Sequence, residues 1–183
     1  MSRATTLQSE RAYRIEPEPQ YTPQIGALAE MMNYTRLTTL QAVEGLSVEQ
    51  LDAVPEGFGN SIGMLLAHIA AVDRAYQILS FEGRDLGEGD EVIQGGLSMG
   101  KNGTPPPTGQ SLETLLAELE ASRAETLKAF ANKDDEWLAS NMTVPDFDYP
   151  NHHWAWFHVM EDEVSHRGQI RILRKHVAPK KKG

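Results

Sequence analysis

Apolar residues recur at steps of three and four along four long segments of this chain, and no segment alternates apolar with polar residues. This spacing gathers the apolar side chains on one face of an α-helix, whereas a half-buried strand needs a step of two. The four segments cover about residues 22–43, 61–83, 111–130 and 151–177, and short helical turns are predicted at 47–54 and 135–139. The pattern therefore predicts an all-α fold, an antiparallel four-helix bundle in which each helix buries one apolar face.

Local signals indicate where these segments begin and where they are interrupted. Thr22 before Pro23 is typical of a helix start, with a capping hydroxyl and a proline in the first turn. Ser47 and Gln50 have the spacing of a capping box. Between residues 83 and 109 the chain has eight glycines and three consecutive prolines, which predicts a long loop between the second and third long helices. That loop is interpreted either as a lid over a site or as a connection without function.

The length of 183 residues is that of one domain, which we expect to span residues 22–178. Residues 1–21 form a polar N-terminal segment, and residues 179–183 form a basic tail containing Lys180, Lys181 and Lys182. The first 20 residues lack the apolar core of a secretory signal, and no stretch approaches 18 uninterrupted apolar residues. A cytoplasmic protein that spans no membrane is predicted.

The charge and the cysteine content limit which partners the protein can bind and which reactions its own side chains can perform. Seventeen Lys and Arg against 26 Asp and Glu give a net charge of −9, which opposes binding to nucleic acid or to an anionic membrane. The chain has no cysteine, so disulfides, zinc–thiolate clusters and a protein-borne sulfur nucleophile are excluded. Any thiol chemistry would therefore need a thiol co-substrate.

Three residues of metal-binding type lie on the predicted inner faces of two helices. Asp162 and His166 are four residues apart, so their side chains share one face of the last helix, and His68 faces inward from the second. His158 precedes Asp162 by four residues, so either His158 or His166 could join Asp162 and His68. The two histidines are about 12 Å apart along the axis, too far to share one ion. Three such ligands indicate a catalytic divalent metal, and the alternative is a buried His-Asp-His network without metal.

Charged residues that flank the inner faces of the helices are expected to face solvent. Glu161 and Glu163 each lie one helical step, about 100°, from Asp162, which argues against either as the base of a metal-dependent hydrolase. Arg123 is likewise expected on an outer face of the third helix. His152 and His153 could form a second metal site or a stacking site, but their position at a helix start explains them adequately.

Residues 61–74 around His68, together with a C-terminal helix carrying His158 and the run from His166 to Ile170, resemble the DinB-like (DinB/YfiT-like) superfamily of small four-helix metalloproteins. The resemblance covers about residues 22–177. It implies a divalent ion, most often zinc or nickel, held here by His68, Asp162 and His166. His158 would orient Asp162 or contact substrate. The commonest family pattern has histidine at the position of Asp162, and the thiol-transferase branch has glutamate there.

The same resemblance implies a function and an assembly. It implies transfer of a low-molecular-weight thiol of the bacillithiol or mycothiol type to an electrophilic small molecule, by a homodimer. A metal-dependent hydrolase and a non-catalytic dimeric stress-related binding protein are the alternatives. Residues that select the substrate are expected in the loop 83–110 and at the open end of the bundle.

Overall fold

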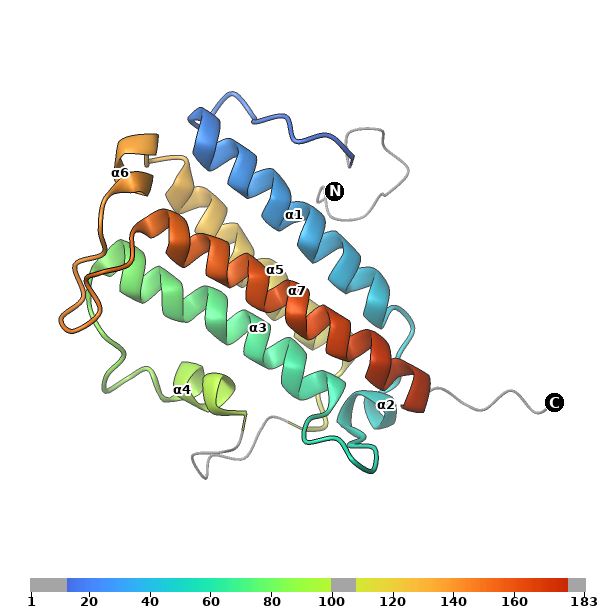
Figure 1. Ribbon diagram of the computed structural model, residues 1–183. Helices are drawn as coiled ribbons and strands as arrows, with labels where there is room; N and C mark the ends of the chain where they lie inside the picture. Colours follow the sequence, from blue (N-terminus) through green and yellow to red (C-terminus); the bar gives the residue numbers. More distant parts are fainter. Residues whose placement is uncertain (1–12, 100–107, 178–183) are drawn as a thin grey trace.

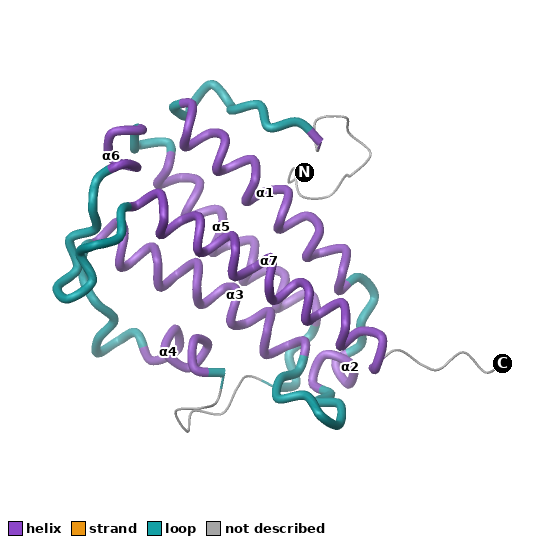
Figure 2. The backbone as a smooth tube through the Cα atoms, in the orientation of Figure 1, coloured by secondary structure: helices purple, strands orange, loops and turns teal. Residues whose placement is uncertain are grey.

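The computed structural model describes residues 13–99 and 108–177. Four long helices lie side by side: α1 (Pro23–Val43), α3 (Ile62–Gln77), α5 (Leu112–Phe130) and α7 (His152–Val177) (Figure 1). Shorter elements connect them: α2 (Val48–Asp52), the π-helical turn η3 (Ile78–Glu82), α4 (Glu91–Ser98) and α6 (Asp135–Ala139). Within the described residues no strand forms, and only two isolated β-bridges occur (Figure 2). The all-α prediction is confirmed.

Two buried apolar clusters show the direction of each long helix. The first cluster combines the C-terminal parts of α1 and α7 with the N-terminal parts of α3 and α5. The second combines the N-terminal parts of α1 and α7 with the opposite ends of α3 and α5. Helices α1 and α7 therefore run parallel to each other, as do α3 and α5, and the two pairs are antiparallel, as for α3 against α7 (Figure 1). The connection from α3 to α5 must consequently return along the whole molecule.

Part of that connection is helical, and the prediction of an unbroken loop is wrong for residues 91–98. Helix α4 packs on α3, and Gly96 is the residue that permits the contact. A Cβ atom at Gly96 would lie 2.6 Å from the Cβ of Ala71 and 3.4 Å from the carbonyl oxygen of Ala67. The glycines that indicated a loop thus allow close helix packing instead. The rest of the glycine- and proline-rich segment, residues 100–107, lies outside the described residues, as do the basic tail and residues 1–12.

The start of α1 is confirmed at Pro23, but its cap differs from the prediction. The Thr22 side chain makes no capping hydrogen bond to the helix. The carboxylate of Asp135, in α6, accepts hydrogen bonds from the backbone N–H groups of Gln24 and Ile25 and from the Thr22 hydroxyl. A residue 110 positions away in sequence therefore closes this helix end and ties α6 to α1.

Four charged side chains, one from each long helix, meet between the two apolar clusters. Arg36 of α1 donates to both carboxylate oxygens of Glu163 of α7, at 2.8 and 3.2 Å, and its Nη2 lies 2.9 Å from Asp73 of α3. Arg123 of α5 contacts Glu163 at 3.0 Å and Asp73 at 3.3 Å. All four side chains are buried, so the expectation that Glu163 and Arg123 face solvent is wrong. We call Arg36, Asp73, Arg123 and Glu163 the charge ring.

The charge ring fixes how α7 is rotated about its axis. Its two arginines also donate to the backbone carbonyls of Leu119 and Met32, so the guanidinium groups are well satisfied in the interior. With Glu163 held toward the centre, the preceding residue, Asp162, is turned by about 100° toward α3. The ring therefore presents Asp162 to the side of the molecule where His68 lies.

The stretch Ile62–Glu82 is long and apolar enough to cross a bilayer, judged by length and composition alone. Within its most apolar window, 67% of the residues are buried inside the protein. It packs against α4, α5 and α7, so its apolar character is that of a central core helix.

Candidate metal centre

The structure brings together three of the residues singled out in the sequence. His68 of α3 and Asp162 and His166 of α7 each offer a ligand atom, and these atoms lie within 4.8 Å of one another. His166 Nε2 is 3.3 Å from Asp162 Oδ1, and His68 Nε2 is 3.7 Å from Asp162 Oδ2. The two imidazole rings meet edge to face, with centroids 4.7 Å apart. Of the two ligand sets left open by the spacing, the geometry assembles the one containing His166.

Each imidazole is oriented by a hydrogen bond at its Nδ1 atom. His68 Nδ1 is 3.1 Å from the carbonyl oxygen of Gly96 in α4, and His166 Nδ1 is 3.2 Å from Oε1 of Gln169. Because a carbonyl oxygen only accepts hydrogen bonds, each Nδ1 carries the proton. The Nε2 atom of each ring then faces Asp162. Metal-binding histidines are commonly oriented in this way.

Asp162 occupies a position where an uncompensated carboxylate is costly. Its Oδ2 atom is buried and has no hydrogen-bond partner among the described residues. Burial alone raises the pKa of this carboxyl, but the imidazoles of His166 and His68 outweigh that effect and hold the pKa well below its usual range. Burial also lowers the pKa of His166, yet Asp162 and Gln169 raise it to a net value above the ordinary one. The centre is therefore built around a charged carboxylate.

A network without metal satisfies this geometry poorly. His68 Nε2 lies 3.7 Å from Asp162 Oδ2, which is too far for a hydrogen bond, so Oδ2 stays without a hydrogen-bond partner among the described residues. A cation bound by these atoms supplies the missing partner of Oδ2. Two imidazole nitrogens and one carboxylate oxygen are also a donor set that zinc, nickel, iron and manganese accept. The residues present fit a divalent ion.

His158 lies one helical turn from Asp162, and its contacts among the described residues are with other side chains. Its ring stacks on Trp154, with centroids 5.1 Å apart and planes 6° apart, and Nδ1 lies 3.3 Å from Glu161 Oε2. The ring of Tyr76 meets His158 edge-on at 5.8 Å. These contacts put His158 on the wall beside the centre, and its expected role, to orient Asp162 or to contact substrate, stays a prediction.

His152 is buried and engaged in a structural cluster. Its Nδ1 lies 2.9 Å from the hydroxyl of Ser80, which also accepts a hydrogen bond from Trp156 Nε1. Its ring stacks on Trp137 at 4.2 Å. Burial, with a smaller effect from Lys133, lowers the pKa of His152 to about 4. Within the part of the chain that the structure describes, the only cluster of three potential ligands is the one around Asp162.

Two residues near the centre were not predicted from the sequence. Gly96 supplies the carbonyl that orients His68, but its segment has the composition of a loop. Tyr76 lies about two helical turns beyond His68, among apolar residues at helical spacing. Burial, with the charges of Asp162 and Tyr149, raises the pKa of Tyr76 to about 12, so its hydroxyl keeps its proton at neutral pH. The signal in the sequence was the interval of eight residues between His68 and Tyr76, which places both side chains on one face of α3.

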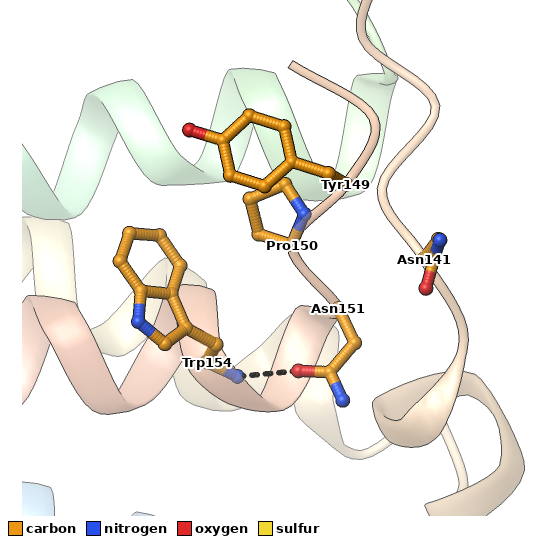
Figure 3. Close-up of a pocket in the computed structure, with 5 residues that line it drawn as sticks. All are labelled: Asn141, Tyr149, Pro150, Asn151 and Trp154. Atoms are coloured by element: carbon orange, nitrogen blue, oxygen red, sulfur yellow. Dashed lines mark hydrogen bonds between the residues drawn. The ribbon is translucent and has the colours of Figure 1, made fainter.

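A shallow pocket of about 370 Å³ opens at the N-terminal end of α7. It is lined by Asn141, Tyr149, Pro150, Asn151 and Trp154 (Figure 3). Asn151 Oδ1 accepts a hydrogen bond from the backbone N–H of Trp154, which fixes the start of the helix. Because Trp154 also stacks on His158, the pocket adjoins the wall that leads to Asp162.

Comparison with known families identifies the family to which the chain belongs. A sequence model described as mycothiol-S-transferase matches residues 27–179, which carry His68, Asp162 and His166. This is a DinB-like family, so the predicted resemblance is confirmed. No curated protein sequence matches the chain significantly. The chain belongs to the mycothiol-S-transferase family.

Proposed function

We propose that this protein transfers a low-molecular-weight thiol of the mycothiol type to an electrophilic small molecule at a divalent metal held by His68, Asp162 and His166. We also propose that the four long helices form the four-helix bundle of the DinB-like superfamily. The resident ion in this proposal is zinc or nickel. The observation that carries the proposal is the convergence of two oriented imidazole nitrogens on a buried carboxylate oxygen that lacks a partner. Family membership supports a thiol as the co-substrate.

The chain itself provides no sulfur nucleophile, because it contains no cysteine. The reacting sulfur must come from the bound thiol. When bound at these residues, a divalent cation would lower the pKa of a thiol and favour its thiolate at neutral pH. The sulfur then forms a bond to the electrophilic carbon and the thiol proton passes to solvent. The displaced electron pair leaves with the leaving group or, for an unsaturated acceptor, takes up a proton.

The surrounding residues hold and orient the reactants. Gly96 and Gln169 keep the imidazoles of His68 and His166 aimed at Asp162. Tyr76 remains protonated, so its hydroxyl is the group that we expect to donate a hydrogen bond to the acceptor. Packing of α4 over α3 restricts access of water to the centre from that side.

Hydrolysis by a metal-bound hydroxide is the weaker candidate. Of the two carboxylates considered as its base, Glu163 is held by two arginines of the charge ring. Glu161 is about half exposed and lies beside His158. Both carboxylates are thus engaged away from the position that a base would need.

The function is tested by thiol-dependent consumption of an electrophile such as 1-chloro-2,4-dinitrobenzene, with mycothiol as donor and metal-loaded protein. Asp162→Asn and His166→Ala should each lower kcat/KM by at least about 100-fold. His176→Ala is the matched control, since this exposed histidine lies on the same helix far from the centre. Unchanged rates in both ligand variants, or rates equal to those without protein, would refute the proposal.

A homodimer is also proposed, from the family resemblance and from one surface. Phe157, Val164 and Ile172 are exposed at seven- and eight-residue steps, so they share an outer face of α7. Light scattering should give twice the mass of the 20.3 kDa chain, and Val164→Glu should shift it to the monomer mass. A monomer mass for the unaltered protein would contradict this.

A further inference from the structure

Two arginines on α7 lack the partners that the other described arginines have. Most of the described arginines pair with a carboxylate: Arg14, Arg36, Arg74, Arg84 and Arg123. Arg174 donates to two backbone carbonyls at the C-terminal end of α1. Arg167 donates only to the neutral hydroxyl of Thr38, and its buried Nε atom has no partner among the described residues. Arg171, which is exposed one helical turn further on, has no hydrogen-bond or ion-pair partner among them either.

Neither the charge balance of the chain nor the helix dipole explains this pair. The chain has 26 acidic against 17 basic residues, so carboxylates are not scarce, yet α7 has none after Glu163. The favourable effect of a helix dipole on cations is confined to the last turn, which in α7 already holds other basic residues. Arg167 and Arg171 lie before that turn, and like charges four residues apart destabilise a helix. A compensating negative charge is therefore missing beside the pair.

The part of α1 that faces the pair is neutral and polar. Arg167 reaches α1 at Thr38, whose own hydroxyl donates to the carbonyl oxygens of Tyr34 and Thr35. Tyr34, Thr38 and Gln41 follow one another at steps of four and three, so they share one face of α1. Tyr34 and Gln41 are exposed, and no acidic residue lies between them in the sequence. An anion beside Arg167 thus meets hydroxyl and carboxamide groups on α1 and two guanidinium groups on α7.

This surface is separate from the metal centre, although Arg167 directly follows His166 in the sequence. Five residues of helix rotate Arg167 by about 140° from Asp162 about the axis of α7. Asp162 accordingly lies against His68 of α3, whereas Arg167 lies against α1, on the other side of α7 (Figure 1). A ligand of the arginine pair is therefore neither the thiol nor its acceptor. Its binding does not rest on the proposed function.

We propose that Arg167 and Arg171 bind a phosphate group, a compact oxyanion with two negative charges, on the α1 side of α7. Two guanidinium groups balance two charges, and the paired N–H groups of each match the spacing of phosphate oxygens. A phosphate monoester carries a charge of about −1.5 to −2 at neutral pH, whereas a carboxylate carries one negative charge. The phosphate is either inorganic or part of a small organic molecule, for which Tyr34 supplies a ring that is 43% exposed.

Binding is measured on the protein as purified, at constant ionic strength, by following the NMR signals of the Cζ atoms of Arg167 and Arg171. Inorganic phosphate should shift both signals saturably, with a dissociation constant that is roughly millimolar. Acetate, which carries one charge, should bind at least about threefold more weakly. The shifts should persist after treatment with phenanthroline, a neutral chelator, because phosphate held by a metal ion would then be lost.

Variants of the exposed arginine assign the binding to this pair. Arg171→Gln should weaken phosphate binding at least about tenfold, measured at the Arg167 signal, and circular dichroism should show an unchanged fold. Arg171→Lys should restore only part of the affinity, because lysine keeps the charge but lacks the paired N–H groups. Arg74→Gln is the matched control: this arginine on α3 is also partly exposed but already pairs with Glu118, so its loss should leave phosphate binding unchanged.

Phenyl phosphate distinguishes the two sources of the phosphate group. Tighter binding of phenyl phosphate than of inorganic phosphate, with the difference lost in Tyr34→Ala, would assign the site to a phosphate monoester, and equal affinities would assign it to inorganic phosphate. The absence of a saturable shift, equal affinity for acetate, or unchanged affinity in Arg171→Gln would overturn the proposal. If phosphate does not bind and Arg171→Gln changes the mass from dimer to monomer in light scattering, the pair binds a carboxylate of a second copy instead.

Discussion

Replacing Arg36 by methionine unbalances the charge ring. The ring is neutral with two arginines and two carboxylates, and the substitution leaves it with a buried net charge of −1. Arg36 contacts Glu163 at 2.8 and 3.2 Å and Asp73 at 2.9 Å, and its side chain is 5% exposed. Removing one partner of a buried ion pair costs about 3–5 kcal/mol. Because two carboxylates lose a partner here, we expect a loss of about 4 kcal/mol in the free energy of unfolding.

Urea denaturation followed by circular dichroism at 222 nm measures this loss. With an m-value of about 2 kcal/mol/M, the midpoint should fall by about 2 M. The double variant Arg36→Met/Glu163→Met keeps Arg123 and Asp73 as a matched pair, so it should be more stable than Arg36→Met alone.

The exposed pair between Arg74 and Glu118, at 3.0 Å, gives the control, and Arg74→Met should cost less than about 0.5 kcal/mol. A loss below about 1 kcal/mol in Arg36→Met would refute the reasoning. A double variant whose loss of unfolding free energy equals the sum of the losses in Arg36→Met and Glu163→Met would also refute it.

Three further predictions concern the parts that hold the centre and the fold. Gly96→Ala puts a Cβ atom 2.6 Å from that of Ala71, so α4 must shift and release His68. The metal affinity, measured by competition with a chelator, should therefore fall about tenfold. An unchanged metal affinity would contradict this prediction. Burial lowers the pKa of His152 from 6.5 to about 4, so the unfolded chain takes up the proton first and stability falls as the pH drops through this range. Between pH 7 and pH 4.5 the His152 contribution should fall by roughly 2 kcal/mol in urea denaturation, and His152→Gln should lack that part of the slope. Asp135→Ala removes the cap of α1 and should lower the unfolding free energy by about 1–2 kcal/mol, whereas no change in thermal unfolding would argue against the cap.

The parts of the fold that depend on local spacing could be predicted from the sequence. The apolar periodicity located the four long helices, and the four-residue step from Asp162 to His166, with the resemblance around His68, selected the residues that the structure brings together. These signals are readable because each depends on residues within one or two helical turns.

Features that depend on distant contacts could not be predicted in this way. Glu163 and Arg36 are 127 residues apart, and nothing in the sequence around either indicates a buried partner. Helix α4 forms in a segment of low helix propensity because Gly96 allows it to pack on α3. The parallel course of α3 and α5 likewise follows from the tertiary packing of both apolar clusters, which local periodicity does not encode.

Elemental analysis of protein without a histidine tag measures whether His68, Asp162 and His166 bind a divalent metal. After reconstitution with zinc or nickel, we expect close to one metal ion per chain, and a loss of that metal in His68→Ala, Asp162→Asn and His166→Ala but not in His176→Ala. Circular dichroism of each variant must show that it remains folded. Absence of metal from the unaltered protein, or full metal content in the folded His68→Ala and His166→Ala variants, would show that these residues do not form a metal site.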